Sequence, residues 1–371
     1  MRILHLLAPA GFGGMETVVR SLAAGHARRG HSVTVAGILD TPAEEHPFSV
    51  ALEGSGVRFH PLFLPGRRYL EERRTVASLL RTLDPEVLHT HGYRPDVVDS
   101  PVAARMGVGT VTTVHGFVGQ GLRNKVYEWL QLRAFRRMDT VVPVSEKLGR
   151  QLVGEGVEVH RVRVIRNAWT PASQPLGRRE AREILGLSMD SFVIGWVGRF
   201  TREKSVDIHL RAYALLENPE ARLSLVGGGP EEPSLRSLAH DLSLLDRIHW
   251  QGVVPEARNL FAAFDVLALT SWSEGTPMVL LEAMAAGTPI VTTRVGGIGD
   301  MVSADEAVLV PPNDPEVVAE ALASVFLGPG PAEKRAASAR SRLEREFTLD
   351  PWLDQYEEVY QSVGRSSRSG G

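Results

Sequence analysis

Short apolar runs alternate with longer amphipathic segments along the whole chain. The runs predict buried strands, and segments with apolar residues every three or four positions predict helices that pack on them. The expected strands are Arg2–Leu7, Val33–Ile38, Val87–His91, Gly109–Val114, Thr140–Val144, Val162–Ile165, Phe192–Val197, Arg222–Val226, Ile248–Gln251, Val266–Thr270, Pro289–Thr292 and Ala307–Val310. Expected helices include Glu16–Arg29, Tyr69–Thr82 and Asn124–Arg137. The alternation is typical of an α/β fold with parallel sheets.

A stretch rich in turn-forming residues, Thr170–Gly177, interrupts this alternation and predicts a linker. The sequence therefore predicts two doubly wound domains, residues 1–172 and 173–350, followed by a helix over 351–363 and a disordered tail over 364–371. Because ligands of open α/β sheets gather beyond the carboxyl ends of the strands, we expect the site in a cleft between the two domains.

Composition narrows the class of protein. The 371 residues include no cysteine, which excludes disulfides and thiolate chemistry. The net charge of −3 argues against nucleic acid as the main partner. The charge is uneven, with +6 over residues 1–172 and −9 over the remainder, so the first domain either meets something anionic or merely carries a drift of surface charge.

The amino terminus and the hydropathy of the chain bear on location. No run approaches the ~20 apolar residues of a membrane helix. The first residues, Met-Arg-Ile-Leu-His-Leu-Leu, lack the features of a signal peptide and predict a strand. We expect a cytoplasmic protein.

A glycine-rich loop follows the first predicted strand. Gly13 and Gly14 open a helix there, and glycines at a helix start let the backbone approach a phosphate. Gly11 and Gly13 match half of a dinucleotide fingerprint, with Asp40 at a distance suited to a ribose, but Glu16 replaces the third glycine. A phosphate site and a structural turn are equally compatible with the loop.

Charged residues follow two predicted strands of the second domain. Arg199 and Lys204 could converge on one diphosphate, or both could be solvated surface charges. Glu274 precedes an apolar helix and Glu282 lies within it. Since a buried carboxylate needs a partner, ligand hydroxyls are a better explanation for Glu282 than a structural ion pair.

These motifs together resemble one family, the retaining nucleotide-sugar glycosyltransferases of the GT-B fold, group 4 (GT4). The resemblance runs from Arg2 to about Phe347. The motifs that carry it are Gly13-Gly14, Val114-His115-Gly116, Gly198-Arg199 with Lys204, Leu225-Val-Gly-Gly-Gly-Pro230 and the stretch from Ser273 through Glu274 and Glu282 to Gly287. The sequence departs from the family at Gly228, where an acidic residue often stands.

The resemblance implies a fold of two Rossmann-like domains facing across a cleft, and it implies a role for each matching residue. Arg199 and Lys204 would hold the donor diphosphate, Glu274 and His115 would bind the donor sugar, Glu282 would bind the ribose, and Gly14 would offer its amide. The further donor-binding positions that it implies are Gly13, Gly198, Gly228, Gly275, Thr276 and Pro277.

The resemblance also implies a reaction. Sugar would pass from a UDP- or GDP-linked donor to an acceptor hydroxyl with retained configuration, in polysaccharide, glycolipid or glycoside biosynthesis, and the leaving phosphate would help to deprotonate the acceptor. No cofactor is implied. The sequence has no Asp-x-Asp, so no metal on the diphosphate is indicated. His89 and His91 share a strand face and could bind zinc, although structural or acceptor-side roles fit them better.

The acceptor is not specified by any motif. The segment Arg123–Arg137 is basic and carries Trp129 and Phe135, so it could contact anionic lipid beside a lipid-linked acceptor, or it could be an ordinary half-buried helix. Three other functions stay open: a GT-B nucleotide-sugar epimerase, a nicotinamide-dependent dehydrogenase that uses Asp40, and a non-catalytic nucleotide-sugar sensor.

Overall fold

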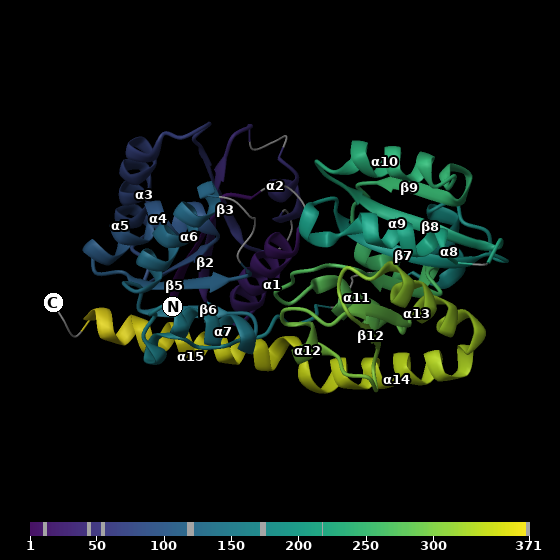
Figure 1. The fold of residues 1–371 in the computed structure, drawn as a ribbon. Helices are drawn as coiled ribbons and strands as arrows, with labels where there is room; N and C mark the ends of the chain where they lie inside the picture. Colours follow the sequence, from purple (N-terminus) through teal and green to yellow (C-terminus); the bar gives the residue numbers. More distant parts are fainter. Residues whose placement is uncertain are drawn as a thin grey trace. The chain divides into compact units, whose positions relative to one another are not determined.

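The computed structural model describes residues 1–9, 13–42, 46–52, 56–116, 122–170, 176–216 and 218–368, and for residues 47, 51, 122–124 and 365–368 it describes the backbone alone. The chain forms two compact units (Figure 1). Unit 1 comprises Met1–Ala168 and Leu349–Gly371, and unit 2 comprises Trp169–Thr348. The division thus precedes the boundary expected after residue 172, which lies outside the described residues.

Unit 1 is built on a six-stranded parallel sheet with the order β3-β2-β1-β4-β5-β6. Its strands are β1 (Arg2–Leu7), β2 (Ser32–Leu39), β3 (Arg58–Phe63), β4 (Val87–His91), β5 (Gly109–Val114) and β6 (Thr140–Pro143). The order reverses beside β1, and such a switch point is where a doubly wound sheet binds ligands at its carboxyl edge.

Helices cover both faces of this sheet. They are α1 (Gly14–Arg28), α2 (Pro47–Leu52), α3 (Tyr69–Leu83), α4 (Tyr93–Val98), α5 (Ser100–Arg105), α6 (Leu122–Phe135), α7 (Glu146–Gly154), the short η2 (Val159–Arg161) and α15 (Leu349–Arg368). Val76 and Leu79 of α3 pack with Leu4 and Leu6 of β1 in one buried cluster. Helices α1 and α15 cover the other face.

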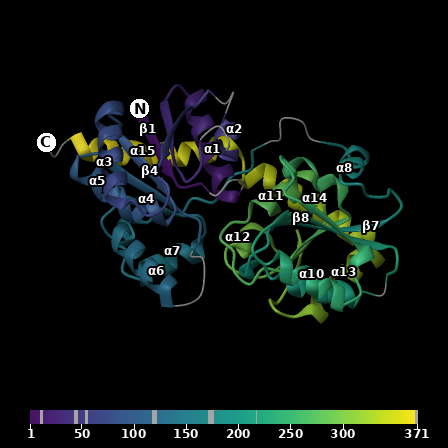
Figure 2. The ribbon, with the colours of Figure 1, turned by 90° about the horizontal axis from the view of Figure 1, so that it is seen from above.

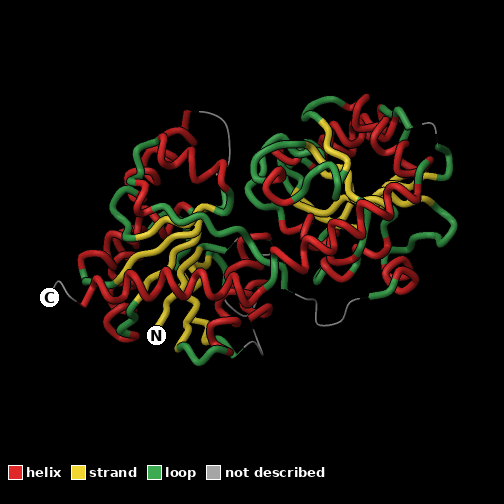
Figure 3. The backbone as a smooth tube through the Cα atoms, turned by 90° about the horizontal axis from the view of Figure 1, so that it is seen from below, coloured by secondary structure: helices red, strands yellow, loops and turns green. Residues whose placement is uncertain are grey.

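Helix α15 brings the end of the chain back to unit 1, beside α1 and across β4 and β5 (Figures 2 and 3). Its buried positions recur every three or four residues, as expected for a helix with one apolar face: Trp352, Leu353, Tyr356, Val359, Tyr360 and Val363. The helix continues to Arg368, which corrects the expectation of a disordered tail from Gly364 for the first five of those residues. Packing of the preceding turns carries the helix beyond its last apolar residue.

Unit 2 repeats the architecture with the strand order β12-β11-β10-β7-β8-β9, again parallel. Its strands are β7 (Phe192–Arg199), β8 (Ala221–Gly228), β9 (Ile248–Gly252), β10 (Val266–Leu269), β11 (Ile290–Thr293) and β12 (Val308–Val310). Its helices are α8 (Arg178–Ile184), α9 (Val206–Ala214), α10 (Glu232–Asp241), α11 (Met278–Ala286), α12 (Ile298–Met301), α13 (Pro315–Leu327), α14 (Pro329–Glu346) and the short η3 (Arg202–Lys204), η4 (Leu245–Arg247), η5 (Ala257–Asn259) and η6 (Phe261–Ala263).

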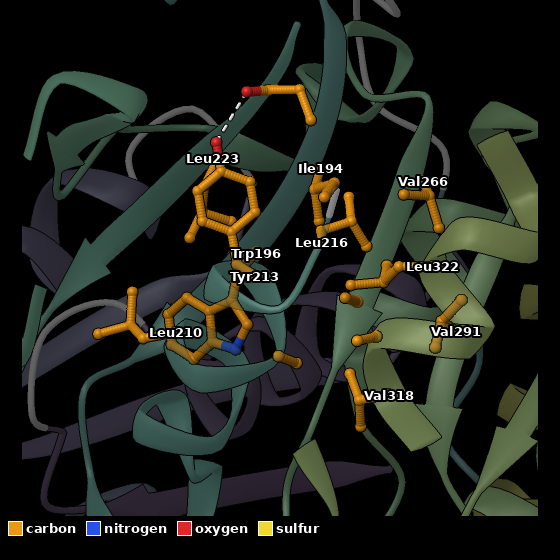
Figure 4. Close-up of a cluster of buried hydrophobic side chains, with 14 of the residues drawn as sticks. Ile194, Trp196, Leu210, Tyr213, Leu216, Leu223, Val266, Val291, Val318 and Leu322 are labelled. Atoms are coloured by element: carbon orange, nitrogen blue, oxygen red, sulfur yellow. Dashed lines mark hydrogen bonds between the residues drawn. The ribbon is translucent and has the colours of Figure 1, made fainter. Parts of the chain in front are cut away.

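The core of unit 2 forms on both faces of its sheet. On one face Trp196 of β7 packs with Leu210 and Tyr213 of α9 and Leu322 of α13 (Figure 4). The Tyr213 hydroxyl donates a hydrogen bond of 2.7 Å to the carbonyl of Ala221, which satisfies the one polar atom of its buried side chain. On the other face, helices α8, α11 and α14 cover the sheet.

Two strand predictions need correction. The run Val162–Ile165 is not a strand: Val162 forms an isolated bridge with Val141, and Arg163 and Ile165 donate single hydrogen bonds to β6. Strand β3 was not expected, because polar residues and Pro61 interrupt the apolar run by which the other strands were predicted. A proline is tolerated there because β3 is an edge strand.

The other eleven strands match the predicted runs to within two residues at each end. Within the described parts of the chain, no helix has both the length and the apolar character needed to cross a bilayer.

Candidate active site

At the carboxyl edge of the unit 2 sheet, the ends of β7 and β8 lie close together. Gly198 and Arg199 align with Gly227 and Gly228, and the amide of Phe200 donates to the carbonyl of Gly228 at 3.0 Å. Gly227 has φ of +137°, and a Cβ atom there would overlap the carbonyl oxygen of Gly198. The glycine turn therefore lets the two strand ends approach more closely than any side chain would allow.

Arg199 and Lys204 occupy different environments at this edge. Arg199 ends β7 with an exposed side chain, and its guanidinium has no acidic partner in the portion of the chain that is described. Lys204 ends η3, and its Nζ lies 2.6 Å from Oε1 of Glu274. The structure thus joins Lys204 to Glu274 and leaves Arg199 free to meet an anion.

Glu274 is the most tightly held acidic group of the edge. Its Oε1 accepts hydrogen bonds of 2.6 Å from both Lys204 Nζ and the Ser271 hydroxyl, and its side chain is 7% exposed. Its other carboxylate oxygen, Oε2, accepts no hydrogen bond within the described residues. One oxygen is therefore fixed by the protein, and the other can accept from a ligand hydroxyl.

The loop that carries Glu274 is braced from two sides. The indole nitrogen of Trp272 donates to the carbonyl of Arg202 at 3.0 Å, and the Trp272 amide donates to the carbonyl of Glu203 at 3.0 Å. On the other side the amide of Gly297 donates to the carbonyl of Glu274 at 3.2 Å. Gly296 has φ of +55°, and a Cβ atom there would overlap the same carbonyl. Ser271 and Trp272, next to the recognised motif, were not singled out from the sequence.

Helix α11 begins directly after Gly275, Thr276 and Pro277. No side chain caps its first turn, so backbone N–H groups at its start can donate to a ligand. Just over one turn into the helix, the half-buried Glu282 lacks a hydrogen-bond partner among the residues described. Burial raises the pKa of Glu282 to about 7, a rise that Arg258 opposes and Glu256 reinforces. A carboxyl group in this state gains from any ligand hydroxyl that donates to it.

Unit 1 places two predicted positions at the start of α1. Gly13 is the N-cap in an extended conformation, and its carbonyl accepts from the Thr17 hydroxyl at 3.0 Å. Gly14 is the first helical residue. A Cβ atom on Gly13 would lie 2.6 Å from a carboxylate oxygen of Glu16, so a larger residue there would displace that flexible side chain. Gly11 of the proposed dinucleotide fingerprint lies outside the described residues.

His115 follows β5 at the same sheet edge of unit 1. Burial lowers the pKa of His115 to about 4, so the ring is neutral near pH 7. Its Nε2 is buried and has no hydrogen-bond partner in the described structure. The next residue, Gly116, has φ of +140°, where glycine is favoured. An orphaned ring nitrogen at a ligand-binding edge is consistent with the role that the sequence resemblance implies.

The predicted pair His89 and His91 belongs to a larger buried cluster that includes His5. Possible ligand atoms of the three side chains all lie within 4.8 Å of one another. However, both ring nitrogens of His89 are engaged, by the Tyr360 hydroxyl at 2.8 Å and the Thr113 hydroxyl at 2.9 Å. His5 Nδ1 and His91 Nε2 share a hydrogen bond of 3.1 Å. Zinc binding would require these bonds to break, so the cluster fits a hydrogen-bonded role better.

The structure also describes Asp40, the candidate ribose ligand, and part of the basic segment 123–137, the candidate lipid contact. Asp40 is exposed after β2, and its Oδ1 accepts from the Gly66 amide at 3.0 Å, which braces the loop after β3. In the basic segment 123–137, Val126 and Trp129 of α6 are more than half exposed, and the guanidinium of Arg133 lies 5.9 Å from the Trp129 ring centre. These side chains are on the surface, whereas Phe135 is buried.

Each unit thus pairs a doubly wound sheet with candidate ligand-binding residues at its carboxyl edge. Two Rossmann-like domains with these motifs define the GT-B class of glycosyltransferases. The model of the family Glycosyl transferases group 1 matches residues 177–342, and the model of Glycosyltransferase Family 4 matches residues 12–171. The chain belongs to the GT4 glycosyltransferases.

Individual relatives agree with this family. The D-inositol 3-phosphate glycosyltransferase of Saccharomonospora viridis is 31% identical, over 94% of this chain and 89% of the relative. The N-acetyl-alpha-D-glucosaminyl L-malate synthase of Bacillus anthracis is 26% identical, over 80% and 79%. The crystal structure of HepE from Anabaena in complex with UDP-glucose is 22% identical with a TM-score of 0.84, over 98% of this chain and all of that one, a likeness that shows the fold.

Proposed function

We propose that this glycosyltransferase moves a sugar from a nucleotide-diphosphate donor to an acceptor hydroxyl with retention of the anomeric configuration. The observation that carries the proposal is the Lys204–Glu274 pair, where one carboxylate oxygen is held by Lys204 and Ser271 and the other is available. A cation for a diphosphate and an acceptor for sugar hydroxyls are thereby in contact.

Relatives and fold neighbours support the donor class. The titles of the HepE structures name UDP and UDP-glucose as ligands of that protein. Arg199, free of acidic partners in the described structure, and Lys204 would stabilise negative charge on the leaving diphosphate, a term that is usually large in transfer reactions. Glu282 would accept from the ribose hydroxyls, and the start of α11 after Gly275, Thr276 and Pro277 would offer amides to the donor.

The proposed retaining mechanism, attack on the same face of the sugar, needs no nucleophile from the protein. This fits an edge whose described residues include no serine–histidine–aspartate set. In the proposed step the bond between the anomeric carbon and the diphosphate oxygen breaks, and the acceptor oxygen bonds to that carbon on the same face. The acceptor proton passes to the leaving phosphate oxygen. Gly14 would donate its amide to the donor, Gly13, Gly198 and Gly228 would admit it sterically, and His115 Nε2 would meet a sugar hydroxyl.

The first experiment identifies the donor and tests the pair. Thermal shift against UDP-, GDP- and ADP-linked sugars selects the donor, because a ligand at 100 times its Kd adds about 2.7 kcal/mol of stability. Lys204→Ala and Glu274→Gln are then expected to lower kcat about 100-fold or more. Lys334→Ala, an exposed lysine of α14, is the matched control and leaves kcat unchanged.

Three outcomes would contradict the proposal. Equal turnover by Lys204→Ala and the Lys334→Ala control would remove Lys204 from the site. Formation of an epimer from the donor alone would indicate an epimerase, and donor binding without product for any acceptor would indicate a sensor. The anomeric configuration of the product, read by NMR, tests retention.

We expect activity to persist in EDTA, because Arg199 and Lys204 supply the positive charge.

A further inference from the structure

A cluster of three tyrosines and one arginine lies at the carboxyl edge of the unit 1 sheet. Arg67 and Tyr69 come from the loop after β3 and the start of α3, Tyr93 is the first residue of α4 after β4, and Tyr127 lies on α6. None of these residues was predicted as a site residue, and no motif of the family resemblance includes them.

Arg67, Tyr93 and Tyr127 contact one another through Tyr127, and Tyr69 interacts electrostatically with Tyr93. Arg67 Nη2 lies 3.4 Å from the Tyr127 hydroxyl, and the rings of Tyr93 and Tyr127 have centres 4.8 Å apart. Burial raises the pKa of Tyr93 above its ordinary value. The nearby Tyr69 and Tyr127 raise it too, and Arg67 lowers it, so the four groups interact electrostatically. They come from three separate segments that the fold brings together.

The hydrogen-bonding capacity of the cluster is largely unused. Within the described structure, neither the Tyr69 nor the Tyr93 hydroxyl has a hydrogen-bond partner, and Arg67 has no acidic partner. The neighbouring arginines differ: Arg94 is bound to the buried Glu72 at 2.8 Å, and Arg68 lies 3.5 Å from Glu71. Arg67, whose described hydrogen bond is to the Tyr127 hydroxyl, therefore remains available to an external anion.

The position of the cluster relates it to the reaction. Tyr93 follows His91 and Gly92 at the end of β4, between β1 and β5, whose ends lead to Gly14 and His115. Gly92 has φ of +89°, and a Cβ atom on it would lie 3.6 Å from the sulfur of Met15, next to Gly14. The cluster and the predicted donor contacts of unit 1 thus share one sheet edge.

We propose that Arg67, Tyr69, Tyr93 and Tyr127 form the acceptor subsite and that the acceptor carries an oxyanion next to its ring or carbon chain. The guanidinium would bind the oxyanion, the free hydroxyls would bind acceptor hydroxyls, and the aromatic rings would pack on its carbon skeleton. This proposal rests on the proposed function, since it names the acceptor class of the same enzyme. The name of one relative includes inositol 3-phosphate, which carries a phosphate, and the name of another includes L-malate, which carries carboxylates.

Direct binding without donor tests the subsite. The probes are D-inositol 3-phosphate against inositol, and L-malate against its diamide, measured by calorimetry on the full chain. We expect at least one anionic probe to bind ten times or more tightly than its neutral partner, as one charge-assisted hydrogen bond allows. Arg67→Gln is expected to abolish this preference, and Tyr127→Phe to weaken it. The two arms distinguish a phosphate from a carboxylate.

The control is Arg81→Gln, which removes an exposed arginine from the far end of the same helix α3 and should leave the preference intact. Equal binding of charged and neutral probes, failure of every anionic probe to bind at millimolar concentration, or an equal loss in Arg81→Gln would overturn the subsite. Because the donor is absent, this result is independent of the proposed function. Anion preference without transfer from any sugar nucleotide would reject the function and leave an anion-binding site without an acceptor role.

Discussion

At the scale of single residues, the structure distinguishes two carboxyl groups that the sequence placed in one motif. Glu274 forms an ion pair with Lys204 and accepts a hydrogen bond from Ser271, whereas Glu282 is half-buried without a hydrogen bond among the residues described. A group in the second situation destabilises the fold when it ionises. The proposed ribose contact would compensate for this cost when the donor binds.

This difference leads to a prediction for Glu282→Gln. The pKa of Glu282 is raised to about 7, so the folded state holds a proton that the unfolded state has lost between about pH 4.5 and 7, and stability falls as pH rises through that range. The variant should therefore be more stable than the wild type at pH 8, by about 1–2 kcal/mol, and unchanged near pH 4.5. Its affinity for the nucleotide should fall.

Urea unfolding at pH 4.5 and 8 measures the first effect, and calorimetry with the selected donor measures the second. A variant whose stability relative to the wild type does not change with pH would show that Glu282 ionises as readily as a solvated carboxyl group.

At the scale of elements, Trp272 joins two segments that each carry one partner of the Lys204–Glu274 pair. Its indole N–H binds the carbonyl of Arg202 in η3, and its own backbone belongs to the loop before Glu274. The three-residue η3 is too short to hold Lys204 by itself. We infer that Trp272 is a positioning residue that fixes the distance between the two charges.

The prediction concerns Trp272→Phe, which removes the donor and keeps an aromatic ring. Loss of one hydrogen bond of about 1 kcal/mol should reduce kcat several-fold, and KM for the donor should change less, because the pair acts on the transition state. The control is Trp352→Phe, since the Trp352 indole nitrogen is buried without a partner in the described structure. An equal fall of kcat in both variants would mean that Trp272 only stabilises the fold.

At the scale of the whole molecule, a buried histidine network connects the last helix, α15, to the sheet of unit 1. His89 binds the Tyr360 hydroxyl, and Thr113, which also binds His89, forms a hydrogen bond of 2.9 Å with Tyr356. On the surface side, Arg29 lies 2.6 Å from Asp354. Residues more than 240 positions apart in sequence therefore form one polar interior under α15.

The network predicts acid sensitivity. Burial is the main cause that lowers the pKa of five histidines of unit 1: to about 3 for His5, to about 4 for His26 and His115, and well below the ordinary value for His89 and His91. The unfolded chain binds protons at these groups below about pH 6.5 and the folded chain does not, so stability falls as pH decreases from about 6.5 towards 4. Each group contributes up to about 1.4 kcal/mol per pH unit.

Two buried carboxyl groups oppose this trend in unit 1. Burial raises the pKa of Asp96 to about 6 and that of Asp99 well above its ordinary value, so both favour the folded state at lower pH. Five histidines outweigh them, and we expect the urea midpoint of unit 1 to be lower at pH 5.5 than at pH 7.5. Circular dichroism follows the unfolding. A midpoint that rises on acidification would show that the histidines are already protonated in the folded chain.

The sequence by itself determined the parts of this protein that depend on local pattern. The apolar runs located all strands but the edge strand β3, and the glycines and charges that follow those runs identified Arg199, Lys204, Glu274 and Glu282 at one sheet edge. Parallel strands all end at the same side of a sheet, so order along the chain was sufficient for that inference.

Only the tertiary structure decided which side chains meet. Several contacts join segments that are distant in sequence: Lys204 with Glu274, Trp272 with η3, α15 with the rest of unit 1, and Arg67 with Tyr127. The local partner Ser271 was likewise identified only by the structure. Such contacts depend on side-chain direction and burial, which periodicity does not encode, and the pKa of a group such as Glu282 depends on the same burial.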